Sequence, residues 1–319
     1  MPVTYFFGKG WDTDMDLCQM LPVSMRNEIP DNCETGLEEV RMRVGWPTEL
    51  LYGDNSTRCL PKASQKDISE TLNYLSGYSL YALASELRQG FFTAKGGHRV
   101  GICGRANPQN AQNTKAEDAG QIQGIVDVSG LNIRIAHERK DCAKKLMPYL
   151  RDGDNIHNTL ILAKPGVGKT TYLRDCIRLI STGDRTHPGL KVSVVDERSE
   201  IAACYRGVPQ NDLGPRVDVL DNCPKVKGMR MLLRAMSPQV IAVDELGGEE
   251  DFAAVFQILY SGSRILGTIH AENIDELSAK PYMEELLQQK KIGRFVVLSK
   301  DEKGRRSCAV YDQDCRRIC

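Results

Sequence analysis

The sequence has no uninterrupted apolar run approaching the roughly 18 residues of a membrane-spanning helix, so no such helix is expected. Its first residues, MPVTYFFGKGWDTDMD, contain neither a basic n-region nor a long apolar stretch, which argues against a secretory signal. Charge of one sign is not in excess, because 42 Lys and Arg residues balance 42 Asp and Glu residues. This balance does not favour nucleic acid or an anionic membrane as a partner.

Metal-binding cysteine patterns are also missing. The chain has 11 cysteines but no Cys-x-x-Cys pair, and its 5 histidines do not cluster with the cysteines. A zinc site is therefore not expected. Cys103 and Cys176 lie within apolar patterns, so most thiols are interpreted as buried and reduced. Cys315 and Cys319 are expected to be the most exposed, with no assigned role.

The segment at 159–171, TLILAKPGVGKTT, carries the strongest functional signal. A strand-like run, a glycine-bearing loop and a pattern of helical spacing follow one another, which is the context of a phosphate-binding loop. Lys169 would reach the β- and γ-phosphates of a nucleotide, and the Thr170 hydroxyl would bind Mg²⁺. The usual first glycine is replaced by Ala163, which costs little if φ is negative there. The predicted nucleotide-binding residues are Ala163, Lys164, Pro165, Gly166, Val167, Gly168, Lys169, Thr170 and Thr171.

Acidic residues follow two further predicted strands. The strand at 190–195 leads into an acidic box that contains Glu197, and the strand at 240–243 leads into Asp244 and Glu245. Ligand-handling residues in open parallel sheets lie at the carboxyl ends of strands. Asp244 is expected to hold Mg²⁺ and Glu245 to polarise the attacking water, with Glu197 as the alternative base. His270, after a strand at 265–269, is placed to sense the γ-phosphate.

The order of elements predicts two domains. Residues 1–150 are expected to form an α+β domain with a connecting helix at 140–150, and residues 151–319 an α/β domain with a mostly parallel sheet. In the first domain we predict a helix at 17–29, a helical region at 68–87 that is broken near Gly77, strands at 37–43, 50–52, 91–93, 99–103, 122–128 and 131–136, and a surface loop at 107–121. In the second we predict further helices at 228–236, 252–260 and 284–290, a hairpin of 295–299 with 308–311, and a long functional loop at 207–228.

The second half resembles the ATPases of type II and type IV secretion machines. Those proteins have a phosphate loop, an acidic box, a strand ending in Glu and a Thr-x-His-Ala box in this order. Here the matching positions are 168–170, 195–201, Glu245 and 268–271. The resemblance implies a RecA-like P-loop ATPase domain. One departure is Asp244, where those ATPases usually have Gly, and it leaves open which acid is the base.

A more extensive resemblance spans nearly the whole chain. The runs GGHRVGICGRA, KPGVGKTTYLRDCIR and VVDERSEIAACYRGVPQNDLGPRVDVLDNCPK look like the stage III sporulation protein AA family. The resemblance implies an ATPase that uses ATP and Mg²⁺ on the cytoplasmic, mother-cell side of a spore-forming bacterium. It further implies a homo-oligomer, a hexamer, held at the inner face of the membrane by integral membrane proteins of a channel complex.

Two other functions remain open. A nucleic-acid-processing ATPase would use a basic stripe of Lys225, Lys227, Arg230 and Arg234, but zero net charge and the lack of interleaved aromatics argue against it, and no nucleic acid is expected. A nucleotide-gated scaffold would bind ATP with little turnover.

P-loop ATPases often complete the γ-phosphate shell with an arginine, sometimes from a neighbouring subunit. The sequence offers Arg134, Arg198 and Arg216 as candidates. Arg216 is the first choice for a contact in trans, because it lies in the predicted long loop.

Overall fold

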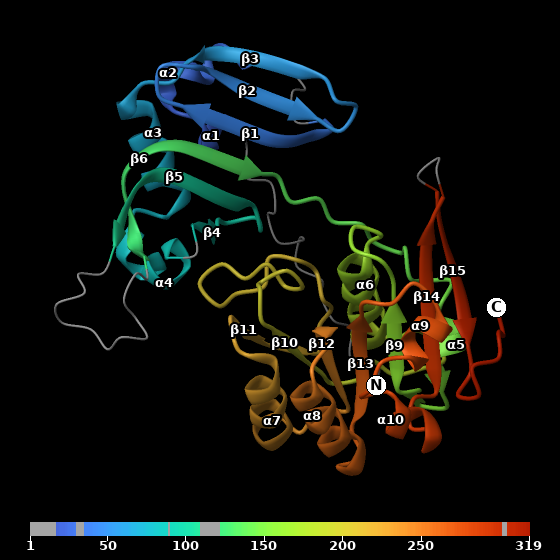
Figure 1. The fold of residues 1–319 in the computed structure, drawn as a ribbon. Helices are drawn as coiled ribbons and strands as arrows, with labels where there is room; N and C mark the ends of the chain where they lie inside the picture. The colour runs from blue at the N-terminus through green and yellow to red at the C-terminus, as the bar shows by residue number, and fades with distance from the viewer. Residues whose placement is uncertain (1–16, 30–34, 89, 109–121, 302–304) are drawn as a thin grey trace, which may run out of the picture. The chain divides into compact units, whose positions relative to one another are not determined.

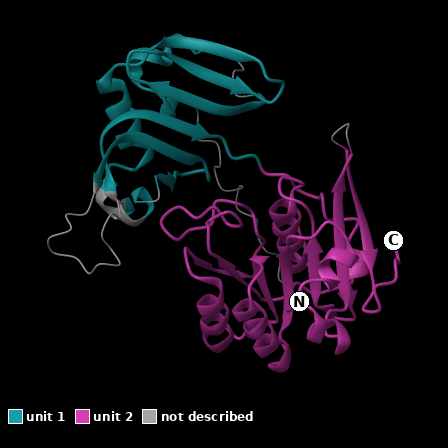
Figure 2. Ribbon diagram, in the orientation of Figure 1, with its two compact units in different colours: residues 1–137 teal, residues 138–319 magenta. Residues whose placement is uncertain are grey.

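The computed structural model describes residues 17–29, 35–88, 90–108, 122–301 and 305–319. The chain divides into two compact units, Met1–His137 and Glu138–Cys319, which Figure 2 shows in separate colours. The predicted boundary near residue 150 therefore lies inside unit 2. The reason is that Ala143, Leu146 and Leu150 are buried in the core of that unit. Over the described ranges, no helix is both long enough and apolar enough to cross a membrane.

Unit 1 is a six-stranded antiparallel sheet with the strand order β3-β2-β1-β6-β5-β4 (Figure 1). In the central strand, Val40 and Met42 are buried, whereas Arg41 and Arg43 between and after them are half-buried. This alternation leaves one face apolar, and the unit 1 core lies against it. The strands are β1 Leu37–Arg43, β2 Pro47–Tyr52, β3 Thr57–Lys62, β4 Phe91–Thr93, β5 Arg99–Pro108 and β6 Ile122–Arg134. The helices are α1 Leu17–Met20, α2 Val23–Arg26, α3 Gln65–Leu75, the 3₁₀ helix η1 Leu80–Leu83 and α4 Ala84–Leu87.

Several predictions for unit 1 are wrong in detail. The helix expected at 17–29 is two short helices, because Pro22 between them has no backbone N–H to continue the first. The strands expected at 122–128 and 131–136 form one strand, β6, with an irregular register opposite Cys103–Arg105 and a positive φ at Asp127. Strand β3 was missed because Leu60 is its single buried residue. Most of the predicted loop at 107–121 lies outside the described residues.

Unit 2 is built on a seven-stranded sheet with the order β11-β10-β12-β13-β9-β14-β15 (Figure 1). All neighbouring strands are parallel except the pair β14–β15. The strands of this sheet are β9 Thr159–Leu162, β10 Val192–Asp196, β11 Val217–Asp221, β12 Val240–Leu246, β13 Arg264–Ile269, β14 Arg294–Lys300 and β15 Arg306–Tyr311, and a small hairpin adds β7 Arg151–Asp152 and β8 Asn155–Ile156. The helices are α5 Met147–Leu150, α6 Lys169–Thr182, α7 Lys225–Ala235, α8 Glu249–Tyr260, α9 Ile274–Ser278 and α10 Glu284–Gln288.

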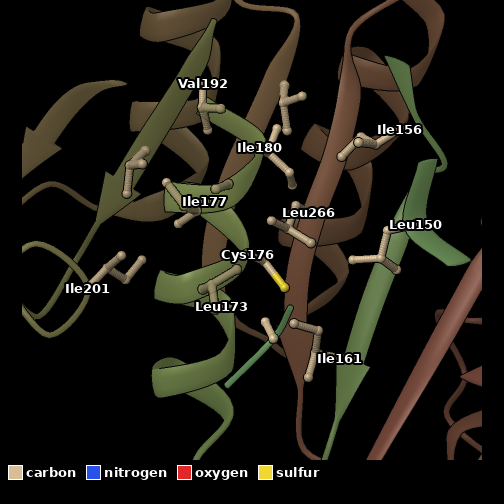
Figure 3. Close-up of a cluster of buried hydrophobic side chains, with 14 of the residues drawn as sticks. Leu150, Ile156, Ile161, Leu173, Cys176, Ile177, Ile180, Val192, Ile201 and Leu266 are labelled. Carbon is tan, nitrogen blue, oxygen red and sulfur yellow. The ribbon is translucent and has the colours of Figure 1, made fainter. Parts of the chain in front are cut away.

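The parallel strands are apolar on both faces, which explains their continuous apolar runs in the sequence. On one face, Ile161 of β9 and Val192 of β10 pack with Leu173, Cys176 and Ile177 of α6 (Figure 3). Leu160 and Leu162 of β9 and Val195 of β10 belong to a second cluster, formed with α7, α8, α9 and α10. The sheet is therefore covered by helices on both faces. This arrangement brings the ends of β9, β10, β12 and β13 to one edge.

The helix predicted at 140–150 is limited to α5, Met147–Leu150. The long loop predicted at 207–228 contains β11, which forms the edge of the sheet beside β10. All residues of β11 are only partly buried, so the strand lacks the apolar run that marks the inner strands. The helix expected from residue 228 begins at Lys225. The hairpin of 295–299 and 308–311 is present as β14–β15.

Candidate nucleotide site

The predicted phosphate loop connects β9 to α6. Gly166 and Gly168 have φ values of 76° and 113°, in the left-handed region where glycine is favoured. Gly168 directly precedes the first residue of α6, so unpaired N–H groups of the helix begin at the loop. Ala163 does not have a positive φ, and its methyl group is buried in the unit 2 core. Replacement of the usual glycine at that position therefore introduces no strain.

Lys169 lies at the centre of the site and is only 7% exposed. Its ammonium donates to the Ala163 carbonyl at 3.1 Å and contacts Nδ1 of His270 at 2.8 Å. Burial lowers the pKa of Lys169, while the nearby Asp244 and Glu245 act in the opposite direction. A cation in this position has few water contacts to lose when an anion approaches.

Asp244 bridges α6 and β13. The Thr170 hydroxyl donates to Asp244 Oδ2 at 2.6 Å, and the Thr268 hydroxyl donates to Oδ1 of the same carboxylate. The two residues predicted to hold Mg²⁺ are thus in direct contact. Thr268 belongs to the Thr-x-His-Ala box, and its hydroxyl also accepts from the Glu245 N–H at 2.9 Å.

Glu245 has a left-handed backbone, with φ 54°, at an irregularity in the pairing of β12 with β13. Its carboxylate lies 3.3 Å from Nε2 of His270 and 2.9 Å from Nη1 of Arg198. Residues other than glycine rarely adopt this conformation, and such strain concentrates at functional sites. The bend directs the acidic side chain toward His270 and the phosphate loop.

The acidic box follows β10 and is held closed by hydrogen bonds. The Asp196 carboxylate accepts from the N–H groups of Glu200, Ile201 and Ala202 at 2.8–3.0 Å. Burial nevertheless raises the pKa of Asp196 to about 6. Arg174 of α6 donates to the carbonyls of Glu200 and Ile201, which ties the acidic box to the phosphate-loop helix. Asp196 thus stabilises the loop.

A small cavity joins the acidic box to the end of β12. Glu197, the alternative base, lies 3.4 Å from Lys225 Nζ. The sequence places Lys225 in a basic stripe that is predicted to lie on the surface. In the structure its ammonium also donates to the Glu245 carbonyl at 2.5 Å. The cavity is lined by Asp196, Glu197, Arg198, Glu200, Asp244 and Glu245.

The candidate arginines lie in three different places. Arg198 contacts Glu245 within the same unit. Arg216 is exposed and precedes β11; its guanidinium donates to the Gly189 carbonyl at 2.6 Å, at the edge of the sheet opposite the phosphate loop. Arg134 is the last residue of β6 in unit 1. Within unit 2, Arg198 therefore lies at the candidate site, whereas Arg216 contacts Gly189.

Arg306, on β15, was missed because no motif marks it. Its Nε donates to the Val167 carbonyl at 2.9 Å, so the β14–β15 hairpin contacts the phosphate loop. Beside this contact is a cavity of about 240 Å³ lined by Arg139, Cys142, Gly168, Thr171, Tyr172 and Arg306. Lys164, at the start of the loop, forms a surface ion pair with Glu272 at 2.7 Å, and Pro165 is exposed.

Residues 13–318 match the family model described as "Sporulation stage III, protein AA". The chain belongs to this family. One family relative, stage III sporulation protein AA of Bacillus subtilis (strain 168), is 39% identical over 302 residues, covering 94% of this chain and 95% of the relative. Another relative of this sporulation-family chain, the uncharacterized protein ycf45 of Porphyra purpurea, is 30% identical over 183 residues, covering 56% of this chain and 30% of that protein.

The fold of this chain is similar to those of a solved ATPase and a solved pilus retraction motor. The ATPase DotB of Legionella pneumophila superposes with a TM-score of 0.56 at 13% identity, covering 89% of this chain and 79% of that chain. The pilus retraction motor PilT with bound ADP gives a TM-score of 0.56 at 14% identity, covering 87% and 79%. These likenesses establish the fold.

The residues of the family member described here fit a magnesium nucleotide. Glycine at 166 and 168 leaves the loop backbone open to a phosphate group, and no atom lies within 4 Å of a Cβ built at Gly166. Mg²⁺ usually binds through one or two carboxylates and phosphate oxygens. Thr170 and Asp244 supply a hydroxyl and a carboxylate of this kind. In the described ranges no cluster of three or more His, Cys, Asp or Glu forms a separate metal cage.

Proposed function

We propose that this chain binds ATP with Mg²⁺ at the phosphate loop and hydrolyses it. The observation that carries the proposal is the convergence of Lys169, His270 and Glu245. The ammonium contacts one nitrogen of the imidazole and the carboxylate lies at the other, at 2.8 and 3.3 Å. The proposed phosphate-binding cation, Lys169, and the candidate base, Glu245, thus contact the same imidazole, that of His270, at the carboxyl ends of the strands.

Each residue has a separate role in this proposal. Lys169 and the N–H groups of the loop hold the β- and γ-phosphates. Thr170 and Asp244 would hold Mg²⁺, and the ion would supply charge neutralisation for the phosphate oxygens. Glu245 orients the attacking water and accepts its proton, and Glu197 is the alternative base. His270 lies between Lys169 and Glu245 and senses whether the γ-phosphate is present.

The cavity beside Arg306 is suited to the nucleoside end of ATP. It adjoins Gly168 and Thr171, which lie at the start of α6. Tyr172 supplies an aromatic ring, and Arg139 and Arg306 supply cations. The nucleotide then lies with its phosphates toward Glu245 and its base toward β15.

We further propose that hydrolysis drives a secretion-like channel complex during sporulation. Support comes from the family, and from a fold shared with DotB and with PilT, which is a retraction motor. In this proposal the chain is a homo-oligomer, a hexamer, and works on the cytoplasmic, mother-cell side. Integral membrane proteins of the channel hold it at the inner face of the membrane. P-loop ATPases sometimes complete the γ-phosphate shell with an arginine from a neighbouring subunit, so assembly and activity are expected to be linked.

The test is phosphate release by the purified chain with Mg²⁺–ATP, together with nucleotide binding. Lys169→Ala is expected to abolish binding or turnover, because the ammonium no longer neutralises phosphate charge. Glu245→Gln is expected to keep binding and lower turnover by about 10²- to 10⁴-fold. Lys191→Ala, at an exposed position away from the site, is the matched control.

Wild-type turnover in Lys169→Ala would overturn the assignment of the phosphate loop. A small effect of Glu245→Gln beside a large effect of Glu197→Gln would move the base to the acidic box. ATP binding without any phosphate release would favour the nucleotide-gated scaffold. Salt-dependent DNA binding would favour a nucleic-acid-processing enzyme, although Lys225 of the basic stripe is engaged with Glu245.

A further inference from the structure

Lys225 is enclosed by three elements that meet beside the proposed base. It is the first residue of α7, and its side chain is 16% exposed. Its ammonium donates to the Glu245 carbonyl at 2.5 Å. It also lies 3.4 Å from the Glu197 carboxylate and 3.8 Å from the Asp251 carboxylate. Its three contacts belong to the end of β12, the loop after β10 and the first turn of α8.

The backbone of Glu245 is held by side chains instead of by the sheet. The pairing of β12 with β13 runs to Val243 and resumes at Leu246, so Glu245 falls in the gap. Its N–H donates to Thr268 Oγ1 at 2.9 Å and to Asp244 Oδ1 at 3.0 Å. Its carbonyl accepts from Lys225. With φ at 54°, this residue needs such contacts to persist in a strained conformation.

Lys225 differs in this respect from its neighbour on the same helix. Lys227, two residues on, is exposed. Arg230, one turn on, donates to the side chain of Gln257. A basic stripe on a surface helix would not explain why Lys225 contacts Glu197, Asp251 and the Glu245 carbonyl while the other cations of the stripe are exposed. The half-buried ammonium of Lys225 instead faces two carboxylates and the carbonyl of the strained residue Glu245.

We propose that Lys225 is a positioning residue that fixes the conformation of Glu245 for water activation. The inference rests on the proposed ATPase function, in which Glu245 is the base. Lys225 acts through the Glu245 carbonyl and does not touch the nucleotide. Loss of its ammonium releases the bend at Glu245, and the carboxylate moves out of line with His270 and the phosphate loop.

The test is a double-mutant cycle between Lys225→Met and Glu245→Gln, with Lys227→Met as the matched control. Lys225→Met is expected to lower kcat by about 10-fold or more and to change KM and nucleotide affinity by less than about 2-fold. In the Glu245→Gln background the same change is expected to lower kcat by less than about 2-fold, because the positioned group is already gone. Lys225→Arg keeps a cation and a donor and is expected to recover part of kcat.

A second readout does not depend on turnover. Hydrogen exchange at the amides of residues 244–248 is expected to speed up in Lys225→Met and to stay unchanged in Lys227→Met. If Lys225→Met fails to fold, Lys225→Gln takes its place in the cycle, since it also removes the ammonium but leaves a polar side chain beside Glu197 and Asp251.

Equal losses of kcat in both backgrounds, or unchanged exchange at 244–248, would overturn the positioning role. A wild-type chain without any turnover would instead count against the proposed function. A wild type that turns over ATP and responds to Glu245→Gln but not to Lys225→Met would count against this inference alone.

Discussion

Asp196 is a buried carboxyl group that accepts three backbone hydrogen bonds. These bonds favour the charged form, but burial outweighs them and raises the pKa of Asp196 to about 6 from its ordinary 3.8. The neighbouring Asp221 on β11 adds to the effect, and burial raises its own pKa as well. The carboxyl group that closes the acidic box is therefore charged at a cost to stability.

A raised carboxyl pKa means that the folded protein holds this proton more tightly than the unfolded chain does. The contribution of Asp196 to stability is complete below about pH 3.8 and is lost as the pH rises through about 6. Asp196→Asn has no such titration. The stability of wild type relative to Asp196→Asn is expected to fall by on the order of 3 kcal/mol between pH 4 and pH 7, at about 1.4 kcal/mol per pKa unit.

Urea unfolding of both proteins at a series of pH values measures this difference. The comparison cancels the other carboxylates, which titrate in both proteins. A difference that stays constant across the range would show that Asp196 keeps an ordinary pKa in the folded chain.

At the scale of elements, the β14–β15 hairpin reaches the phosphate loop through one side chain. Arg306 donates to the Val167 carbonyl and lies 3.5 Å from a Cβ built at Gly168. Arg305, its neighbour, is paired with Asp301 and is 76% exposed. Substituting each arginine in turn therefore distinguishes the effect of the loop contact made by Arg306 from the effect of losing a surface charge at Arg305.

Arg306→Gln is expected to weaken nucleotide binding by about 10-fold, because a charged donor is lost from the loop and from the adjoining cavity. Arg305→Gln is expected to change binding by less than about 2-fold, since exposed ion pairs contribute little. Titration with a fluorescent ATP analogue measures both. Equal nucleotide affinities of the two variants would show that Arg306 of the β14–β15 hairpin does not contribute to nucleotide binding.

The inner elements of unit 2 could be predicted because they are apolar on both faces. β9, β10, β12 and β13 are buried over most of their length, and such runs stand out in a sequence. The edge strands β3 and β11 could not, since most of their residues face solvent or are half-buried. Burial by tertiary neighbours, which a local pattern does not contain, decides their conformation.

The same limit applies to the candidate site. Lys169, Thr170, Asp244, Glu245 and His270 lie in motifs whose spacing reflects strand ends, and the structure brings them together. Lys225 and Arg306 reach the site from a helix and a hairpin with no motif of their own. Their roles depend on contacts between residues far apart in the sequence. In the sequence alone, Lys225 was indistinguishable from the surface cations of its helix.

At the scale of the whole molecule, the proposed oligomer decides whether Arg216 has a role in catalysis. Within its own unit Arg216 lies at the amino ends of β10 and β11, whereas the phosphate loop follows the carboxyl end of β9. Arg216→Ala is expected to leave nucleotide affinity nearly intact and to suppress turnover, if a neighbouring copy uses this residue. An arginine of this kind contributes about 10³- to 10⁵-fold in rate.

Mixing distinguishes a shared site from a local effect. Arg216→Ala and Lys169→Ala are each expected to be inactive, and their mixture is expected to regain part of the activity. In a mixed interface, an intact phosphate loop can meet an intact Arg216. Phosphate release by the mixture, with co-assembly confirmed by light scattering, gives the answer. Full activity of Arg216→Ala alone would leave Arg198, which contacts Glu245 directly, as the arginine to examine.

The contact of Lys169 with His270 also fixes the tautomer of the imidazole. A protonated lysine has only donors, so Nδ1 of His270 must act as an acceptor and cannot carry a hydrogen. The ring hydrogen then resides on Nε2, where it can be donated to the Glu245 carboxylate. When a phosphate group draws the ammonium away, Nδ1 loses its donor, while the Glu245 carboxylate still holds the ring hydrogen on Nε2. Nucleotide binding would therefore register as a change in the hydrogen bonding of Nδ1 of one histidine.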